Sequence, residues 1–503
     1  MTSIISGAET GRRSSVLRNV FKWSMLAYLA ILPMAETIAL RNLLLFVLLV
    51  TGVAWVVAGR RYWGLYEAVP LPLLAWGGFM ILFPIWAVQP EVALINLKGQ
   101  WGLSIAAWFV GFTGVLLLGR DGLRLWDLVY ASVFLVGVHL LLTLLAWIGL
   151  LGTLKTSDMP WSEIGGALLA ILGGQTPGGW HTQPFPWGFR GFDPMHGNLG
   201  YTASQAIALL TASFFLVPRD SARGGTVKAA AGIAICFFSI VVANSRGAVL
   251  FSLGTLFLAG LAYLLRIRQP AARRGRGPSM SSQVRLARWS VLGLCVALVI
   301  VLAQSFYKDS RWHSMFDKAR AGFLLEDPVT FLCEGLSPQA RDRLRDRLGI
   351  QDEAYLAAVT SGLDGDGGRV VLMRVGLQLL MQQPFGLDGS RHSYKKIMEE
   401  RCGHRPVFEF AHAHQAWIDT SLALGWAGAL LYAFALGYFA LAGWQALRDE
   451  QQRPWAFALF LMSVFWILRG FADSVYREHY LQMQALLLAC LYMRMRLEGR
   501  GPA

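Results

Sequence analysis

The sequence predicts an all-α integral membrane protein that crosses the bilayer about twelve times. The 503-residue chain is 55% apolar and only 15% charged, which is too apolar for a soluble protein of this length. The apolar residues form continuous runs of the roughly 20 residues that a helix needs to cross about 30 Å of hydrocarbon. A spanning segment satisfies its backbone hydrogen bonds as a helix or within a closed barrel, and these runs do not alternate as barrel strands do.

The first run follows basic residues at positions 12, 13, 18 and 22 and has no small-residue cleavage site after it. It is therefore expected to remain as an anchor and not to be removed as a signal peptide. Most of the remaining runs are separated by short polar or basic segments, and two of the gaps are long. The twelve expected spans are residues 23–40, 43–59, 69–88, 101–119, 127–151, 198–217, 228–244, 248–265, 289–306, 415–441, 455–472 and 480–494.

The positions of the basic residues predict the orientation of the chain. With the N-terminus inside, alternate gaps between spans carry the arginines and lysines, and so does the C-terminal tail, as short cytoplasmic loops do. Both termini are therefore expected in the cytoplasm. The basic cytoplasmic loops account for the net charge of +14, so we expect no nucleic-acid partner. The basic residues of these segments are Arg60, Arg61, Arg120, Arg124, Arg219, Arg223, Lys228, Arg266, Arg268, Arg273, Arg274, Arg276, Arg285, Arg288, Arg448, Arg453, Arg494, Arg496 and Arg500.

This orientation leaves two long segments on the outer side. Residues 152–197 form a periplasmic loop rich in Gly, Pro and Trp, and residues 307–413 are long enough for a helical periplasmic cap. Within the cap, Leu372–Met381 has helical spacing and precedes Pro384. The expected division is thus spans one to nine in residues 1–306, the cap in 307–413, and the last three spans with the tail in 414–503.

Two of the five cysteines, Cys333 and Cys402, lie in the expected cap. An oxidising periplasm permits a disulfide between them. Sequence alone does not show whether two cysteines meet in space, so both states stay open.

Polar residues of an unusual kind gather at the outer ends of the spans. The clearest is Arg246, which lies between two apolar runs with almost no loop to hold it. One explanation is that its side chain reaches up to the membrane interface. The other is that its guanidinium is a fixed cation for a phosphate group. Arg190 has a similar position, followed by Gly191, His196 and Asn198 at the start of a span, where free backbone amides favour an anion.

A second polar group opens the tenth span. His412 and His414 precede Asp419, which lies about one helical turn beyond His414. A histidine is a suitable general base near neutral pH. The two histidines lack a cysteine or carboxylate partner at the spacing that metal sites use, so we expect no metal here. An interfacial histidine without a catalytic role is the alternative.

Several short motifs in this outer region resemble those of the O-antigen ligase and O-antigen polymerase family. His414-Gln415 followed after nine residues by Gly425 is similar to the family's histidine element. Ser245-Arg246-Gly247 is similar to its Ser-Arg-Gly turn, and Arg190-Gly191 with Asn198 to its Arg-Gly…Asn segment. The sequence from Pro384 to Gly389 resembles its glycine-containing turn. Gln415 and Asp388 depart from the family's usual residues.

The resemblance covers about residues 185–475, and Arg369 and Arg374 also fit it. It implies an all-helical fold like that of GT-C-like membrane glycosyltransferases. It also implies a donor glycan on undecaprenyl pyrophosphate and an acceptor glycan or lipid A-core, both used on the periplasmic side among membrane lipids. No cofactor, metal or nucleotide sugar is implied.

The mechanism expected from the residues and the resemblance has three parts. Arg190 and Arg246 bind the pyrophosphate, with Arg391 as a further contact, and these cations stabilise the leaving group. His414 accepts the proton of the acceptor hydroxyl as this attacks the anomeric carbon with inversion. Asp419 orients the histidine, Asn198 and His412 lie in the substrate site, and the segment 307–413 covers it.

Three alternatives remain. Within the family, the chain could be a polymerase of an O-antigen or exopolysaccharide, or a protein O-oligosaccharyltransferase. Outside it, a transporter or flippase of a lipid-linked glycan would carry ionisable residues near the membrane midplane. Glu36 and His139 are the deep candidates, and either could instead be a hydrogen-bonded core residue.

Overall fold

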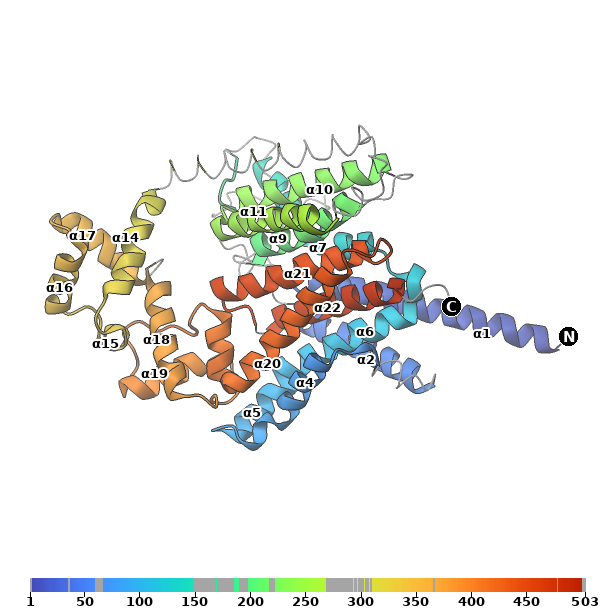
Figure 1. The fold of residues 1–503 in the computed structure, drawn as a ribbon, viewed down its shortest axis with the longest axis horizontal. Coiled ribbons are helices and arrows are strands. Elements are labelled where there is room, and N and C mark those ends of the chain that lie inside the picture. The colour runs from blue at the N-terminus through green and yellow to red at the C-terminus, as the bar shows by residue number, and fades with distance from the viewer. Residues whose placement is uncertain are drawn as a thin grey trace.

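The computed structural model describes residues 2–34, 37–58, 67–148, 185–189, 198–216, 222–267, 310–364, 367–476 and 478–499, with isolated positions between them. These residues form a bundle of long helices with a group of shorter helices at one end (Figure 1). The bundle consists of α1 (Thr2–Ile31), α2 (Ile38–Ala58), α4 (Leu71–Leu82), α5 (Pro90–Asn96), α6 (Gly102–Gly122), α7 (Leu125–Trp147), α9 (Asn198–Leu216), α10 (Ala222–Val242), α11 (Arg246–Ala262), α20 (Ala416–Ala446), α21 (Arg453–Ala472) and α22 (Glu478–Gly499). Short 3₁₀ and π turns, η1 (Phe83–Ile85), η2 (Leu97–Trp101) and η4 (Tyr263–Ile267), extend α4, α6 and α11.

The chain is a multi-pass membrane protein. Six helical segments of the described chain are long and apolar enough to cross a bilayer, and two shorter apolar helices accompany them. The six are Ile38–Ala58, Pro90–Gly122, Leu125–Trp147, Arg246–Ile267, Ala416–Ala446 and Arg453–Ala472. The helical class is thereby confirmed, whereas the number twelve and the orientation stay predictions. The expected span 289–306 lies almost wholly outside the described residues.

The first expected span, 23–40, is wrong at its C-terminal end. α1 ends at Ile31, and α2 begins at Ile38. Pro33 follows α1 and has no backbone N–H to continue a helical ladder, so the chain turns there although its composition stays apolar.

The centre of the bundle is α22, which is buried along most of its length. It packs against α6 at Gly111, where an added Cβ would lie 2.5 Å from the Cβ of Ala489. Small residues permit such close helix packing in membranes. Polar side chains of α22 accept hydrogen bonds from neighbouring helices: Tyr28 donates to Gln482 at 2.6 Å, and Tyr432 donates to Gln484. Burial among other helices explains how a helix of modest hydropathy holds a central place.

The shorter helices form a group with its own hydrophobic core. They are α14 (Ser310–Leu324), α15 (Pro328–Glu334), α16 (Pro338–Leu348), α17 (Glu353–Thr360), α18 (Gly368–Gln382) and α19 (Ser393–Cys402), and they lie together beyond the start of α20 (Figure 1). α18 contains the expected helix and ends before Pro384, as the spacing predicts. Cys333 of α15 and Cys402 of α19 form a disulfide with a Cα–Cα distance of 5.5 Å. This bridge settles the question that the sequence left open.

His139, one of the two deep ionisable candidates, is a core residue. Its ring nitrogens lie 2.9 Å from the hydroxyl of Ser239 and 3.0 Å from the carbonyl oxygen of Phe189. Both nitrogens are therefore satisfied inside the bundle. The other candidate, Glu36, lies outside the described residues.

Candidate active site at the head of α20

Three residues other than glycine have a positive φ in the described chain: Asn244, His414 and Glu478. Each lies at or just before the first turn of a bundle helix, namely α11, α20 and α22. A left-handed backbone is costly for a side chain with a Cβ, and such residues concentrate at functional sites. The strained turns therefore mark the starts of these three helices as candidate functional positions.

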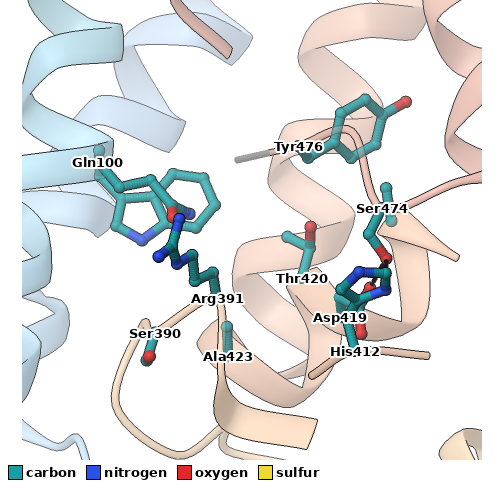
Figure 2. A pocket seen from close by; sticks show the side chains of 11 residues that line it. Gln100, Ser390, Arg391, His412, Asp419, Thr420, Ala423, Ser474 and Tyr476 are labelled. Carbon is teal, nitrogen blue, oxygen red and sulfur yellow. Dashed lines mark hydrogen bonds between the residues drawn. The ribbon is translucent and has the colours of Figure 1, made fainter. Parts of the chain in front are cut away.

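The segment before α20 is fixed by Asp419 in that helix. One oxygen of this carboxylate accepts a 2.8 Å hydrogen bond from the amide of Ala413, and the other accepts the hydroxyl of Ser474. Ser474 also lies 3.1 Å from Nδ1 of His412. Figure 2 shows His412, Asp419 and Ser474 meeting at one wall of a pocket. Asp419 thus positions the backbone that carries both histidines.

The carboxylate beside His414 is that of Asp473, in the turn after α21. Its Oδ1 lies 3.9 Å from Nδ1 of His414, an ion-pair distance and too long for a hydrogen bond. Burial raises the pKa of Asp473, while His414 and the charge of Arg469 lower it. The amide of Ser474, 2.8 Å from Oδ1, also lowers it, and the net pKa is far below its usual value. A permanently ionised carboxylate therefore faces the imidazole.

Sequence reasoning assigned the orienting role to Asp419 and did not select Asp473. The structure gives the two carboxylates different neighbours, since Asp419 contacts Ala413 and Ser474 and Asp473 contacts His414. The argument that singled out Arg246, a charge in a short outer turn between apolar runs, applies equally to Asp473. That signal was present in the sequence.

The turn from Pro384 to Gly389 packs backbone to backbone on α20. The helix kinks at Gly425, whose φ of +76° and ψ of 174° suit only glycine. A Cβ at Gly425 would lie 2.5 Å from the carbonyl carbon of Phe385, and one at Gly386 would lie 2.3 Å from the amide nitrogen of Gly425. Gly386 of the turn and Gly425 of the histidine element therefore meet at one backbone contact, which leaves no room for a Cβ on either residue.

The kink exposes carbonyl groups of α20 that the turn uses. Leu387 donates to the carbonyl of Leu422 and Gly389 to that of Ala423, both at 2.9 Å. In the other direction, the amide of Trp426 donates to Pro384 at 2.9 Å. These three bonds join the turn to α20 as a strand is joined to its neighbour.

Asp388, which departs from the family's usual residue, has a structural role in this turn. It is fully buried, and its Oδ1 accepts 2.9 Å hydrogen bonds from the amide of Ser390 and the hydroxyl of Ser393. Lys396 pairs with its other oxygen. On the opposite side, Trp101 donates a 2.8 Å hydrogen bond to the carbonyl of Gly389. The residues that follow the turn are thus fixed between α20 and the start of α6.

Arg391 follows this turn and lies in a small pocket. Figure 2 shows its guanidinium beside Gln100, across the pocket from His412 and Ser474. The guanidinium forms an ion pair with Glu478 and donates a 2.7 Å hydrogen bond from Nε to the ring of His392. The enclosed space is about 20 Å³, enough for about one water molecule. The walls are Gln100, Trp101, Ser390, Arg391, His412, Ala416, Asp419, Thr420, Ala423, Ser474 and Tyr476.

The Ser245-Arg246-Gly247 turn packs on the first turn of α9. A Cβ at Gly247 would lie 2.8 Å from the hydroxyl of Tyr201, and one at Gly200 would lie 2.4 Å from the hydroxyl of Ser245. The glycines therefore let α9 and α11 approach each other, and Arg246 becomes the first residue of α11, half-buried. The ring of Tyr201 in turn lies 4.3 Å from the guanidinium carbon of Arg469.

The two cap arginines that fit the family have separate roles. Nη1 of Arg374 donates to the carbonyls of Gly322 and Leu325 at 2.8 and 2.7 Å, so this side chain stabilises the cap. Nη1 of Arg369 lies 3.4 Å from the carbonyl of Ala472, next to Asp473. Arg369 thus reaches the candidate site and Arg374 does not.

The expected site residues are brought together in part. His412, Asp419 and Arg391 line one pocket, and His414 adjoins it through the shared segment. The turn that contains Arg246 packs on Tyr201 through Gly247, and the ring of Tyr201 lies against Arg469. The charge of Arg469 acts in turn on Asp473, which faces His414. Arg190, His196 and the side chain of Asn198 lie outside the described residues. In the described chain, no group of three or more His, Cys, Asp or Glu residues could hold a metal ion.

Residues 231–433 match a family model described as O-antigen ligase. The matched stretch includes the turn at Arg246, the cap, the glycine turn and the first part of α20 with its histidines. α21 and α22, which supply Asp473 and Glu478, follow the matched stretch. No curated protein matches the chain.

Proposed function

We propose that the chain, whose residues 231–433 match the O-antigen ligase family model, transfers a glycan from undecaprenyl pyrophosphate to an acceptor hydroxyl. The proposed acceptor is the lipid A-core, at the periplasmic face of the bacterial inner membrane. The position of the Asp473 carboxylate, 3.9 Å from Nδ1 of His414, is the observation that carries this proposal. An imidazole held beside a permanent carboxylate at a polar pocket is suited to accept a proton from a hydroxyl.

The proposed reaction is a single inverting displacement. The acceptor oxygen attacks the anomeric carbon of the donor, and the bond from that carbon to the pyrophosphate oxygen breaks with its electron pair on the phosphate. The hydroxyl proton goes to Nε2 of His414, because Nδ1 faces Asp473. The carboxylate stabilises the imidazolium that forms. Neither a metal nor a nucleotide is needed to balance the reaction.

The leaving pyrophosphate requires positive charge. Arg246 begins α11, where the helix N-terminus adds to its own charge. Arg190, Asn198 and Arg391 complete the proposed phosphate and sugar contacts. Arg391 pairs directly with Glu478, and the pocket that Arg391 lines has room for about one water molecule. Donor binding is therefore proposed to break this ion pair and open the pocket.

The decisive experiment measures glycan transfer by purified chain from a lipid-linked donor to lipid A-core. His414→Ala is expected to lower the rate by about 10²- to 10⁴-fold with unchanged folding, as loss of a general base does. His404→Ala is the matched control, because His404 lies exposed in the cap and contacts the carbonyl of Arg405. Wild-type transfer by His414→Ala would remove the proposed base.

The phosphate contact is tested separately. Arg246→Lys keeps the charge but loses the planar fork, and it should raise the donor KM by about tenfold. Arg374→Lys is the control, since Arg374 donates to cap carbonyls and should affect stability and not donor affinity. An unchanged donor KM in Arg246→Lys would contradict pyrophosphate binding by this residue.

A gene deletion distinguishes the family alternatives. Loss of long glycan on lipopolysaccharide with accumulation of full-length lipid-linked polymer indicates a ligase. Accumulation of single lipid-linked repeat units indicates a polymerase, and loss of glycan from protein alone indicates a protein O-oligosaccharyltransferase. Export of the lipid-linked donor that depends on the chain would indicate a transporter.

A further inference from the structure

Arg469 is a buried arginine in the last turn of α21 that the proposed reaction does not yet use. Its side chain is 1% exposed. Among the residues that the structure describes, this side chain forms no ion pair and no hydrogen bond, and its Nε and Nη2 are both buried without a partner. A buried charge is normally paired and hydrogen-bonded, so an isolated one requires an explanation.

The two other buried arginines of the described chain each form a polar contact, although Nη1 of Arg494 is also buried without a partner. Arg494, in α22, donates from Nε to the carbonyl of Leu123 at 3.1 Å, and its Nη2 pairs with Glu498 at 2.8 Å. Arg41 donates to the carbonyl of Leu32 at 3.3 Å. Arg469 differs from both, although its position in the bundle is equally enclosed.

The surroundings of Arg469 hold the guanidinium in place without occupying its donors. Its guanidinium carbon lies 4.3 Å from the ring of Tyr201, 4.7 Å from that of Tyr480 and 5.1 Å from that of Trp466. Aromatic faces attract a cation but accept no strong hydrogen bond. Asp473 lies close enough for its pKa to respond to Arg469, yet its carboxylate is turned toward His414.

The identity of the two unpartnered atoms indicates the ligand. Nε and Nη2 form one edge of the guanidinium, and their hydrogens point in parallel. This edge is the one that binds two oxygens of a phosphate or carboxylate side-on. Tyr201 and Tyr480 stand in the first turns of α9 and α22, so two helix N-termini add to the positive potential at this point.

We infer that Arg469 binds a phosphate group of the lipid-linked donor side-on through Nε and Nη2. The inference rests on the proposed function, because the charge of this guanidinium acts on Asp473, the neighbour of His414, and Tyr201 lies between the guanidinium and the Arg246 turn. Tyr201 and Tyr480 cover the guanidinium. Both tyrosines lie in first helical turns, so the proposed binding includes rotation of one of these aromatic side chains away from the guanidinium.

The test uses the full chain in nanodiscs of neutral phosphatidylcholine. Farnesyl pyrophosphate is the probe, and both its Kd and its effect on the thermal unfolding midpoint are measured. In Arg469→Met the Kd should weaken by about 10- to 100-fold, as for loss of charge-assisted hydrogen bonds. Without probe, the midpoint should be unchanged or higher, because an unpartnered buried charge has been removed.

Arg494→Met is the matched control. It leaves Glu498 unpaired, so the midpoint without probe should fall, while the Kd for farnesyl pyrophosphate should stay that of the wild type. A purely structural Arg469 would behave like Arg494. A lowered midpoint with a wild-type Kd in Arg469→Met overturns the inference. If that variant does not fold, Arg469→Lys decides: a Kd about tenfold weaker supports a side-on fork, and a wild-type Kd overturns it.

Further arms identify the source of the phosphate. Binding of farnesyl pyrophosphate but not of inorganic phosphate supports a lipid-linked pyrophosphate. Equal, Arg469-dependent binding of both supports a phosphate site for a free anion, and competition by phosphatidylglycerol in the disc supports a headgroup. His414→Ala should bind the probe normally while losing transfer. Arg469-dependent binding without any transfer would leave this inference standing and remove the proposed function.

Discussion

Gly425→Ala tests the contact that carries the glycine turn on α20. At φ +76° and ψ 174° the backbone strain of a residue with a Cβ is about 1–3 kcal/mol. The new methyl group would also lie 2.5 Å from the carbonyl carbon of Phe385, a backbone atom that no rotamer change can move. The turn must then leave the helix, and three backbone hydrogen bonds of about 1 kcal/mol each are lost. The total is about 4–6 kcal/mol.

Amide hydrogen exchange of the peptide that contains Leu387 and Gly389 measures this loss directly. With a factor of ten for every 1.4 kcal/mol, exchange should accelerate by about 10³- to 10⁴-fold, and transfer should fall as Arg391 loses its place. Gly437→Ala is the control in the same helix. Its Cβ would meet nothing within 4 Å, so it should stabilise α20 by about 1 kcal/mol. Wild-type exchange in Gly425→Ala, or equal damage from both variants, would refute the packing argument.

Three further predictions concern the cap and the imidazole. Cys333→Ser removes a disulfide between residues 69 apart in sequence and should destabilise the cap by about 4 kcal/mol. A reductant should therefore lower the unfolding midpoint of the wild type but not that of the variant. Asp473→Asn should reduce kcat by about tenfold or more with little change in donor KM, and an unchanged kcat would contradict the pairing with His414. Because the pKa of Asp473 is lowered by folding, its contribution to stability is complete above the unfolded value of about 4 and is lost only as the pH falls below it. The difference in midpoint between wild type and Asp473→Asn should therefore stay constant from about pH 5 to 8 and shrink in more acid buffer.

The sequence predicted features that depend on local pattern. Continuous apolar runs predicted the helical membrane class, and the helix ending before Pro384 appears as α18. His412 and His414 lie just before α20 and Asp419 in its first turn, so these residues are near one another as the sequence predicts. Helical spacing does not set the direction of His414, whose backbone is left-handed. Composition did not reveal the end of α1 at Ile31, where a proline interrupts an apolar run.

Pairings across the chain were beyond local pattern. His414 has one acidic neighbour in sequence, Asp419, and one in space, Asp473. Only the packed structure shows that Asp419 accepts hydrogen bonds from Ala413 and Ser474 while Asp473 faces His414. The disulfide likewise depends on where α15 and α19 meet.

The amino-acid sequence by itself determined that this chain is a helical membrane protein and which motifs it shares with a glycan-transferring family, since hydropathy and short motifs act over neighbouring residues. Tertiary structure alone decided that Gly386 and Gly425 share one contact and that the edge of Arg469 has no partner in the described chain. The physical reason is that steric exclusion and hydrogen-bond satisfaction are properties of surfaces in contact. Residues far apart in sequence meet at those surfaces only after the helices have packed.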